Sequence, residues 1–435
     1  MLGEMTESQD PLVLSLSKDT PASRLVALDF VRGIAILGIL LLNIVGFAWP
    51  EIVYVSPRAP TAPVSPADDW TWLAIFVVAD GKFRGLFSLL FGASMLLFVE
   101  RAEAARQNFG GRDGAALQRR RLGWLALFGL AHFFLLWWGD ILFLYAVCGF
   151  VALALRGWRP RRLAIAALAI YAAGVLTLGS LTAVGAAPWL GMGETGGETP
   201  AEVVARYGEE ARAEIPATLA PWPNHVAHML RDSWTDPLVT VSFSWFETIP
   251  LMLIGMALFK SGLFAGRWDG ARLRRWAAWG IGGGLALTLP LAWWLWREQF
   301  ALPLTLFVWL GPAAVGRLAS TIGYAALAVL LAQRFAGSAL GERLVACGRM
   351  AFSNYIATSL VMTFIFHGWG LGQFARFGRF ELMGFVLLGW ALMLGWSKPW
   401  LARYRFGPLE WLWRSLTYAK LAPMRRPLAI ESDSQ

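Results

Sequence analysis

The chain has 435 residues, of which 57% are hydrophobic and only 15% are charged. This composition excludes an ordinary soluble domain, because a surface that faces water needs far more polar side chains. The net charge of +9 comes from short basic clusters at the ends of apolar runs, which is typical of membrane topology signals and gives no support to a nucleic-acid partner.

Apolar stretches long enough to cross a bilayer recur along almost the whole chain. A membrane-spanning helix needs roughly 20 apolar residues, and the short polar joins leave no room for a large soluble domain. The sequence therefore predicts an all-α fold, a polytopic transmembrane helix bundle over 24–400, between a disordered cytoplasmic tail (1–23) and an amphipathic cytoplasmic tail (401–435). About ten spans are expected, near 25–48, 70–99, 120–138, 141–156, 163–185, 238–260, 276–296, 309–333, 349–368 and 382–400.

The second stretch, 70–99, is too long for one straight crossing and carries charge in its interior. The run DGKFRG at 80–85 predicts a short helix to residue 79, a break, and a tilted helix to about residue 98. Irregular, charged backbone at membrane depth is tolerated only where it lines a protein-walled cavity. We therefore expect Asp80, Lys82 and Arg84 to line an outer cavity and bind substrate, with Asp80 compensating one of the positive charges.

Basic residues are concentrated in alternate connections. Cytoplasmic loops carry an excess of Arg and Lys, so the Arg-rich connections 100–121, 156–162 and 267–275 are expected in the cytoplasm. The basic residues after 400 belong on the same side. The number of spans is then even, with both termini cytoplasmic, and the predicted location is a bacterial inner (plasma) membrane.

The longest outer connection, 186–237, combines glycine- and proline-rich turns with a helical stretch from Pro200 to about Glu214. Loops on a rigid scaffold often carry function. Two interpretations stay open: a lid over an outer cavity, or a solvated loop with no catalytic part.

The first span carries a polar stripe. On a helix, Asp29, Arg32 and Asn43 fall within about 60° of one another, and Asn43 lies about 21 Å along the axis from Asp29. Ionisable residues inside a membrane are costly, so a functional path is one interpretation. In the other, Asp29 and Arg32 pair and cap the helix end, while Asn43 makes a hydrogen bond between helices.

Five groups of residues carry a resemblance to a known family. They are Leu28-Asp29-x-x-Arg32-Gly33-x-Ala35-x-Leu37-Gly38-Ile39-x-x-x-Asn43; Lys82-Phe83-Arg84-x-Leu86-Phe87-Ser88-x-Leu90-Phe91-Gly92; Gly129-Leu130-x-His132 with Trp138-Gly139-Asp140-Ile141-Leu142; Gly348-Arg349-Met350 with Ser353-Asn354-Tyr355; and Phe406-Gly407-Pro408-x-Glu410-Trp411-x-x-Arg414. These motifs resemble the YeiB-like family of bacterial membrane proteins. The resemblance covers nearly the whole chain, from Arg24 to Tyr418.

More distantly, the family resembles the transmembrane acyltransferase superfamily, which includes O-acetylating bacterial enzymes and heparan-alpha-glucosaminide N-acetyltransferase. The shared signature is mainly Asp29-x-x-Arg32-Gly33, followed by a polar residue late in the first helix. The resemblance implies that acyl-CoA approaches from the cytoplasm and that its acyl group reaches an acceptor, often a sugar hydroxyl or amine, at the outer face. Asn43 matches a position that is His in the O-acylating members and Asn in the N-acetylating one, and Asn cannot act as a general base at neutral pH.

The base must then be another residue, and His132 is the first candidate. It stands eight residues before Asp140, about 12 Å deeper along an outward-running helix. A neutral imidazole with Asp140 or Asn43 nearby can deprotonate an acceptor hydroxyl. The alternative is a packed histidine bonded across helices. The candidate catalytic residues are therefore His132, Asn43 and Asp140.

The other histidines lie toward the outer face. His367, at the outer end of its span, is a second candidate for acceptor binding. His225 and His228 share a face at i, i+3, which fits a metal pair, but no acidic or thiolate third ligand has suitable spacing, and no metal site is expected. Cys148 and Cys347 lie in or beside apolar segments and are expected to be free and buried.

Arg119, Arg120 and Arg121 start the third span on the cytoplasmic side, with Arg32 nearby if the first and third helices pack together. A cluster of guanidinium groups suits the phosphates of CoA. Simple anchoring by positive residues is the alternative. Asp29, Arg32 and this triplet are the candidate acyl-CoA-binding residues.

The run GPLEWLWR at 407–414 starts an amphipathic cytoplasmic helix, in which Glu410 and Arg414 are expected to form an i, i+4 pair. Two roles stay open for this helix: docking under the bundle, or closing over a bound cofactor.

The leading functional hypothesis is a membrane acyltransferase that moves an acyl group, acetyl in the first instance, from cytoplasmic acyl-CoA to an acceptor at the periplasmic face. The alternative is a transporter or permease for a small or lipid-linked substrate, although no internal repeat and no Walker-type loop is found. A non-catalytic scaffold does not explain Lys82 and Arg84. Expected partners are membrane lipid and a small-molecule or glycan acceptor, with no nucleic acid; a homodimer stays open.

Overall fold

The computed structural model of the chain describes residues 21–109, 113–193 and 196–426. Within these ranges the predicted all-helical class is confirmed, since the only β-pairing is an isolated bridge between Tyr404 and Arg425. Residues 1–20 of the expected N-terminal tail, residues 427–435 of the C-terminal tail, and Arg112 lie outside the described residues.

Among the residues that the structure describes, seven stretches are long and apolar enough to cross a membrane, judged by length and composition. They are α1 (Pro21–Ala48), the pair α3 (Pro66–Val78) and α4 (Lys82–Phe109), α7 (Pro160–Ala183), α10 (Asp236–Ser261), α11 (Gly270–Arg297), α13 (Ala313–Phe335) and α16 (Arg379–Arg403). The other expected spans correspond to α5 (Gly114–Leu135) and to two shorter apolar helices, α6 (Leu142–Ala154) and α15 (Ala351–Phe366).

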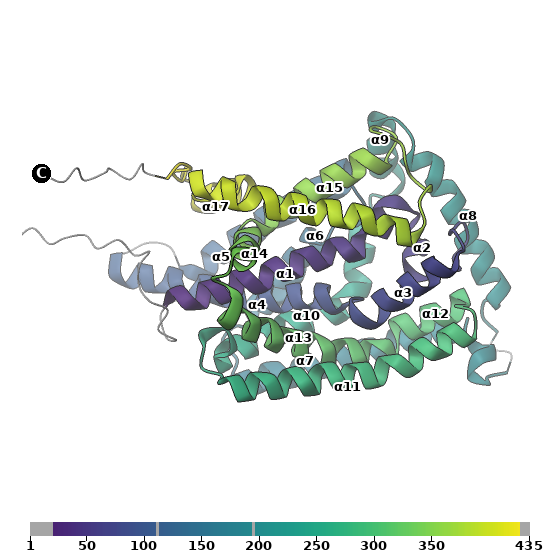
Figure 1. Cartoon of the computed structure of the whole chain (residues 1–435), viewed down its shortest axis with the longest axis horizontal. Coiled ribbons are helices and arrows are strands. Elements are labelled where there is room, and N and C mark those ends of the chain that lie inside the picture. Colours follow the sequence, from purple (N-terminus) through teal and green to yellow (C-terminus); the bar gives the residue numbers. More distant parts are fainter. Residues whose placement is uncertain (1–20, 110–112, 194–195, 427–435) are drawn as a thin grey trace, which may run out of the picture.

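Helix α1 lies inside the bundle (Figure 1), in contact with α4, α13, α15, α16 and α14 (Ala339–Arg349). Helices α7, α11 and α16 lie at the periphery and expose large apolar side chains such as Leu176, Trp279 and Leu387. A soluble protein rarely exposes so much apolar surface. These faces suit contact with lipid, so the architecture is that of a membrane protein.

The expected break in the second stretch is confirmed. Helix α3 ends at Val78 and α4 begins at Lys82. Between them Gly81 has a φ of +67°, a left-handed conformation that glycine adopts without the Cβ penalty of other residues. Helix α4 continues to Phe109, farther than the expected end near residue 98.

Four short α-helices were not expected: α2 (Glu51–Val55), α9 (Trp222–Asp232), α12 (Leu302–Leu310) and α14. The start of the span expected at 309–333 is interrupted. Helix α12 ends at Leu310, and α13 begins at Ala313, after Gly311 and Pro312. Proline lacks an N–H and disfavours helical backbone at the preceding residue, so α12 and α13 are separate helices.

One end of the bundle collects the Arg-rich connections. The start of α5, the connections α6–α7 and α10–α11, and helix α17 (Pro408–Tyr418) gather at the left in Figure 1. Lys260 of α10 donates to the carbonyls of Arg156 and Trp158, at 2.6 and 2.7 Å, which joins two of these connections. We call this the arginine-rich end.

The opposite end is covered by α2 (Glu51–Val55), α8 (Pro200–Thr218) and α9 (Figure 1). The helix predicted from Pro200 is confirmed, and it starts with a capping box between Thr199 and Glu202. Helix α8 contacts α2, α9 and α12, and Glu214 accepts the Glu51 N–H at 3.0 Å. Burial raises the pKa of Glu214 to about 8, so this carboxyl is protonated at neutral pH. The long connection is therefore docked on the bundle rather than free in solvent.

Candidate functional site

Helices α1 and α14 pack with their backbones in contact near the arginine-rich end. A Cβ atom at Gly33 would clash with the carbonyl of Leu344, and one at Gly348 would clash with the carbonyl of Asp29. Only glycine permits so close an approach. This packing holds Arg32 beside the end of α14.

The pairing expected for Asp29 and Arg32 is confirmed, with 2.7 Å between their charged groups. The guanidinium of Arg32 also donates to the hydroxyl of Ser94 at 2.8 Å and to the carbonyl of Gly348 at 3.4 Å. Contacts to three different helices fix the orientation of Arg32.

A cavity of about 150 Å³ lies between α1, α4, α5, α6, α14, α15 and α17. We call it the arginine cavity, because Arg32, Arg121 and Arg349 line it together with one carboxylate, Glu410. Much of the remaining wall is apolar and aromatic, and includes Phe87, Leu90, Phe91, Leu125, Leu142 and Tyr145. The cavity thus combines a cationic region with an apolar wall.

Two of the three guanidinium groups have no ion-pair partner in the described part of the chain. Arg121 lies over the ring of Trp413, 4.0 Å from its centre, and Arg349 donates to the carbonyl of Arg405 at 3.3 Å. A guanidinium group binds phosphate or carboxylate through paired hydrogen bonds. Arg121 and Arg349 are therefore available to an anion, whereas Arg32 is already paired.

Glu410 attaches α17 to the start of α15. Its carboxylate accepts the backbone N–H groups of Phe352 and Ser353, at 2.8 and 3.0 Å, and the hydroxyl of Ser353. The first N–H groups of a helix have no partner inside it, so this carboxylate caps α15. The expected pair with Arg414 does not form, because Glu410 is turned toward α15 and Arg414 lies over Phe406, 5.2 Å from the ring centre.

His132 and Asp140 form a buried pair. The expected offset of about 12 Å along one helix is wrong, because α5 ends at Leu135 and the chain turns to bring Asp140 beside His132. Nδ1 of His132 lies 3.0 Å from the Asp140 carboxylate, and the two side chains are 1% and 2% exposed. The other carboxylate oxygen accepts the Phe143 N–H at 2.8 Å, which fixes its orientation. Nε2 of His132 is buried and has no partner among the described residues. An imidazole oriented by a carboxylate, with its second nitrogen free, is suited to accept a proton.

Tyr355 links this pair to the arginine cavity. Its ring lines the cavity and lies 5.1 Å from the imidazole of His132, measured between ring centres. Its hydroxyl donates to the carbonyl of Gly139 at 3.2 Å. His132 itself does not line the cavity, whereas Tyr355 is a residue of the cavity wall that packs against the candidate base.

Other residues of the predicted site lie apart from the cavity. Asn43 is half-buried, Arg119 is exposed and Arg120 is half-buried, and none of them lines the cavity. Of the residues expected to bind acyl-CoA, only Arg32 and Arg121 line it, with Asp29 behind Arg32.

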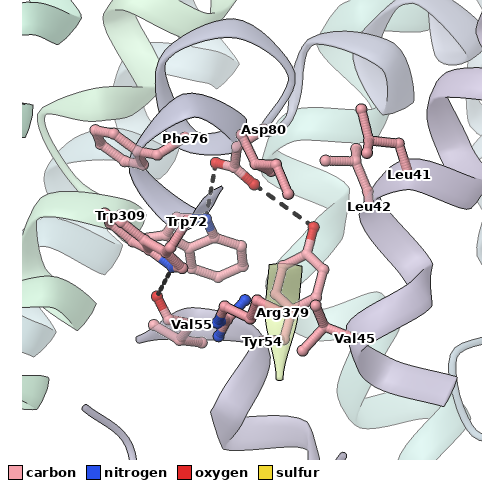
Figure 2. A pocket seen from close by; sticks show the side chains of 11 residues that line it. Leu41, Leu42, Val45, Tyr54, Val55, Trp72, Phe76, Asp80, Trp309 and Arg379 are labelled. Carbon is pink, nitrogen blue, oxygen red and sulfur yellow. Dashed lines mark hydrogen bonds between the residues drawn. The ribbon is translucent and has the colours of Figure 1, made fainter. Parts of the chain in front are cut away.

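A second, much smaller cavity of about 20 Å³ lies beside Asp80. Figure 2 shows the Asp80 carboxylate between the Trp309 indole, which donates to it at 2.9 Å, and the Tyr54 hydroxyl at 3.5 Å. Arg317 pairs with the same carboxylate at 3.2 Å. The volume suffices for about one water molecule, so the acceptor is not held here in this conformation.

The other charges near the break in the second stretch have separate partners. Lys82 is 1% exposed and donates to the carbonyl of Phe76, near the end of α3, at 2.9 Å. Arg84 pairs with Glu247 of α10. Neither side chain lines the cavity beside Asp80, and the Asp80 carboxylate compensates Arg317 in place of Lys82 or Arg84.

Two of the outer histidines, His225 and His367, are buried together, whereas His228 is exposed. His228 is 43% exposed and lies 2.8 Å from Asp232. His225 is buried against His367, with ring centres 5.5 Å apart. The sequence predicted that His225 and His228 share one face of a helix. In the structure His225 turns toward the bundle, whereas His228 is exposed.

Comparison with known proteins finds bacterial relatives that match nearly the whole chain. A family profile described as "Protein of unknown function (DUF418)" matches residues 258–420. The chain is 31% identical to "Uncharacterized protein YeiB" of Escherichia coli (strain K12), over 92% of this chain and 98% of that protein. It is 29% identical to "Uncharacterized protein YxaH" of Bacillus subtilis (strain 168), over 96% and 100%. No solved structure matches the chain significantly.

Proposed function

The chain belongs to the YeiB-like family, and from the arginine cavity we propose that it is a membrane acyltransferase that uses acyl-CoA as donor. The observation that carries this proposal is the position of the cavity, which has free guanidinium groups and ends beside a buried His–Asp pair. The acyl group, acetyl in the first instance, passes from the arginine-rich end to a small-molecule or glycan acceptor that enters from the opposite end.

The phosphates and the apolar arm of acyl-CoA match the groups that line the cavity. CoA carries phosphates, for which Arg121 and Arg349 supply unpaired guanidinium groups. Its pantetheine arm is narrow and largely apolar, which suits the wall formed by residues such as Leu90, Leu125 and Leu142. The volume is too small for a whole CoA, so the nucleotide stays at the mouth and the thioester is directed toward Tyr355.

In the proposed reaction His132 acts as general base. Its free Nε2 takes the proton of an acceptor hydroxyl or amine as the acceptor attacks the thioester carbonyl. A carbon–oxygen or carbon–nitrogen bond forms, the carbon–sulfur bond breaks, and the proton passes from His132 to the CoA thiolate. Asp140 holds the imidazole and stabilises its protonated form. The Tyr355 ring must turn aside to bring the thioester within reach.

The proposed topology has about ten crossings of the bacterial inner membrane. The seven long apolar stretches, together with α5, α6 and α15, support this count. The Arg-rich connections gather at one end of the bundle, which supports placing that end and both termini in the cytoplasm.

Cysteine labelling tests this orientation. Gly157 and Gly337 at the arginine-rich end, and Gly193 at the opposite end, are exposed and have open space for a side chain. In a background without Cys148 and Cys347, Gly193→Cys should react with a membrane-impermeant maleimide in spheroplasts. Gly157→Cys and Gly337→Cys should react only after the membrane is permeabilised. The reverse pattern would overturn the proposed orientation.

The function itself is tested by titrating purified protein with acetyl-CoA and with CoA in a calorimeter. We expect saturable binding of both below millimolar concentration. If neither binds to well-folded protein, the acyltransferase proposal fails. A permease would then be favoured, because the ion pairs Arg84–Glu247 and Asp80–Arg317 join helices of the proposed membrane spans, where charged groups often mark a substrate path.

A further inference from the structure

Two buried imidazoles meet at the end of the bundle opposite the arginine cavity. His225 comes from α9 and His367 caps the C-terminus of α15. They are 5% and 2% exposed, and their ring centres lie 5.5 Å apart at an angle of 65°. The Gly368 N–H donates to the carbonyl of Thr218, the last residue of α8, at 3.1 Å, and this bond holds the end of α15 beside the connection from α8 to α9.

These imidazoles have no polar side-chain partners in the described part of the chain, and the backbone of Ala217 makes only a weak contact with His225. Both ring nitrogens of His225 and Nδ1 of His367 are buried without a well-formed hydrogen bond, as is the indole nitrogen of Trp369. A buried polar group without a partner is costly. Several such atoms on His225, His367 and Trp369 therefore make this region a candidate ligand site.

The chemistry of the pair narrows the kind of ligand. Imidazole nitrogen is a common metal ligand, so two buried imidazoles with ring centres 5.5 Å apart suit a cation.

A third donor follows on α9. Met229 stands one helical turn after His225, on the same face, and is 5% exposed. The hydrogen-bonded pair of His228 and Asp232 lies on the exposed face. The buried face of α9 therefore presents an imidazole and a thioether, and His367 approaches the imidazole from α15.

We propose that His225, His367 and Met229 form a binding site for a copper(I) ion. Thioether sulfur selects Cu⁺ among the ions that imidazole binds, and Cu⁺ is satisfied by two or three uncharged ligands. Zn²⁺ prefers four ligands, often with thiolate or carboxylate, and no group of three His, Cys, Asp or Glu residues is suited to a metal within the described ranges. The site is independent of the proposed acyl transfer.

The test is a titration of the purified full chain with Cu⁺ held by bicinchoninic acid, under anaerobic reducing conditions. The expected result is one Cu⁺ per chain, with nitrogen and sulfur ligands in X-ray absorption at the copper edge. Replacing His225 or His367 by Ala should weaken binding by at least about 100-fold, because even the loss of outer partners of metal ligands costs 10- to 100-fold. Met229→Leu should remove the sulfur signal.

The matched control is His228→Ala, on the same helix, which should bind Cu⁺ as the unmodified chain does. Size-exclusion profiles show which variants fold, and the absorption spectrum of the unmodified protein tests the ligands without any substitution. Three outcomes would overturn the proposal: no stoichiometric Cu⁺, a loss in His228→Ala equal to that in His225→Ala, or tighter binding of Zn²⁺ than of Cu⁺.

Discussion

Replacing His132 by Gln is expected to lower the rate of acyl transfer by about 100- to 10,000-fold, the usual contribution of a general base. Gln keeps a donor for the Asp140 carboxylate and much of the volume but cannot take up a proton at neutral pH. The affinity for acetyl-CoA should stay unchanged, because His132 does not line the arginine cavity. The rate is followed as free CoA thiol released from acetyl-CoA by membrane vesicles, and the affinity by calorimetry.

A second His–Asp pair in the chain provides the matched control. His228 lies beside Asp232 on the exposed face of α9, and His228→Gln should leave the rate of transfer unchanged. Asp140→Asn should also lower the rate, because the amide no longer stabilises a protonated imidazole. Full activity in His132→Gln would remove His132 as the base, whatever the binding data show.

The long helices could be predicted from the sequence because apolar length is a direct signal of a membrane span. The break before α4 was equally clear, since a charged run with Gly81 interrupts an apolar stretch. The short helices α2, α9, α12 and α14 were missed because none is long enough to stand out in a window of roughly 20 residues. Contacts with other helices, such as α14 with α1, hold them in place.

Local pairs in the candidate site were predictable, and distant partners were not. Asp29 and Arg32 are three residues apart, and helical spacing alone brings them together. Glu247 and Arg317 were missed as partners of Arg84 and Asp80, because these contacts join helices far apart in the sequence. A signal was present, since both are charges inside expected spans.

The role of Glu410 needed the structure for a different reason. Its spacing from Arg414 suggested a surface pair on one helix, which contributes little. The unpaired N–H groups at the start of α15 offer the carboxylate better partners. Glu410 could pair with Arg414 on its own helix or with the start of α15. Tertiary packing decides between these partners, and the local sequence around Glu410 does not show the outcome.

Replacing Arg121 and Arg349 together by Gln is expected to weaken binding of CoA and acetyl-CoA by at least about 100-fold. Each charge-assisted contact with a phosphate contributes about 1.5–3 kcal/mol, and two such contacts together correspond to this factor or more. Neither residue is ion-paired in the described part of the chain, so their loss leaves no carboxylate without its partner. Calorimetry measures the change directly.

The matched control is the double variant Arg119→Gln with Arg343→Gln, on the same two helices. Arg119 and Arg343 are exposed and lie outside the wall of the arginine cavity. This control removes the same charge from the arginine-rich end, so general electrostatic attraction falls equally in both double variants. If binding weakens equally in both double variants, the phosphates respond only to the net charge of the arginine-rich end. The arginine cavity would then not be the donor site. Binding that weakens only without Arg121 and Arg349 would assign the donor phosphates to the cavity, because these two are the only ones of the four substituted residues that line it.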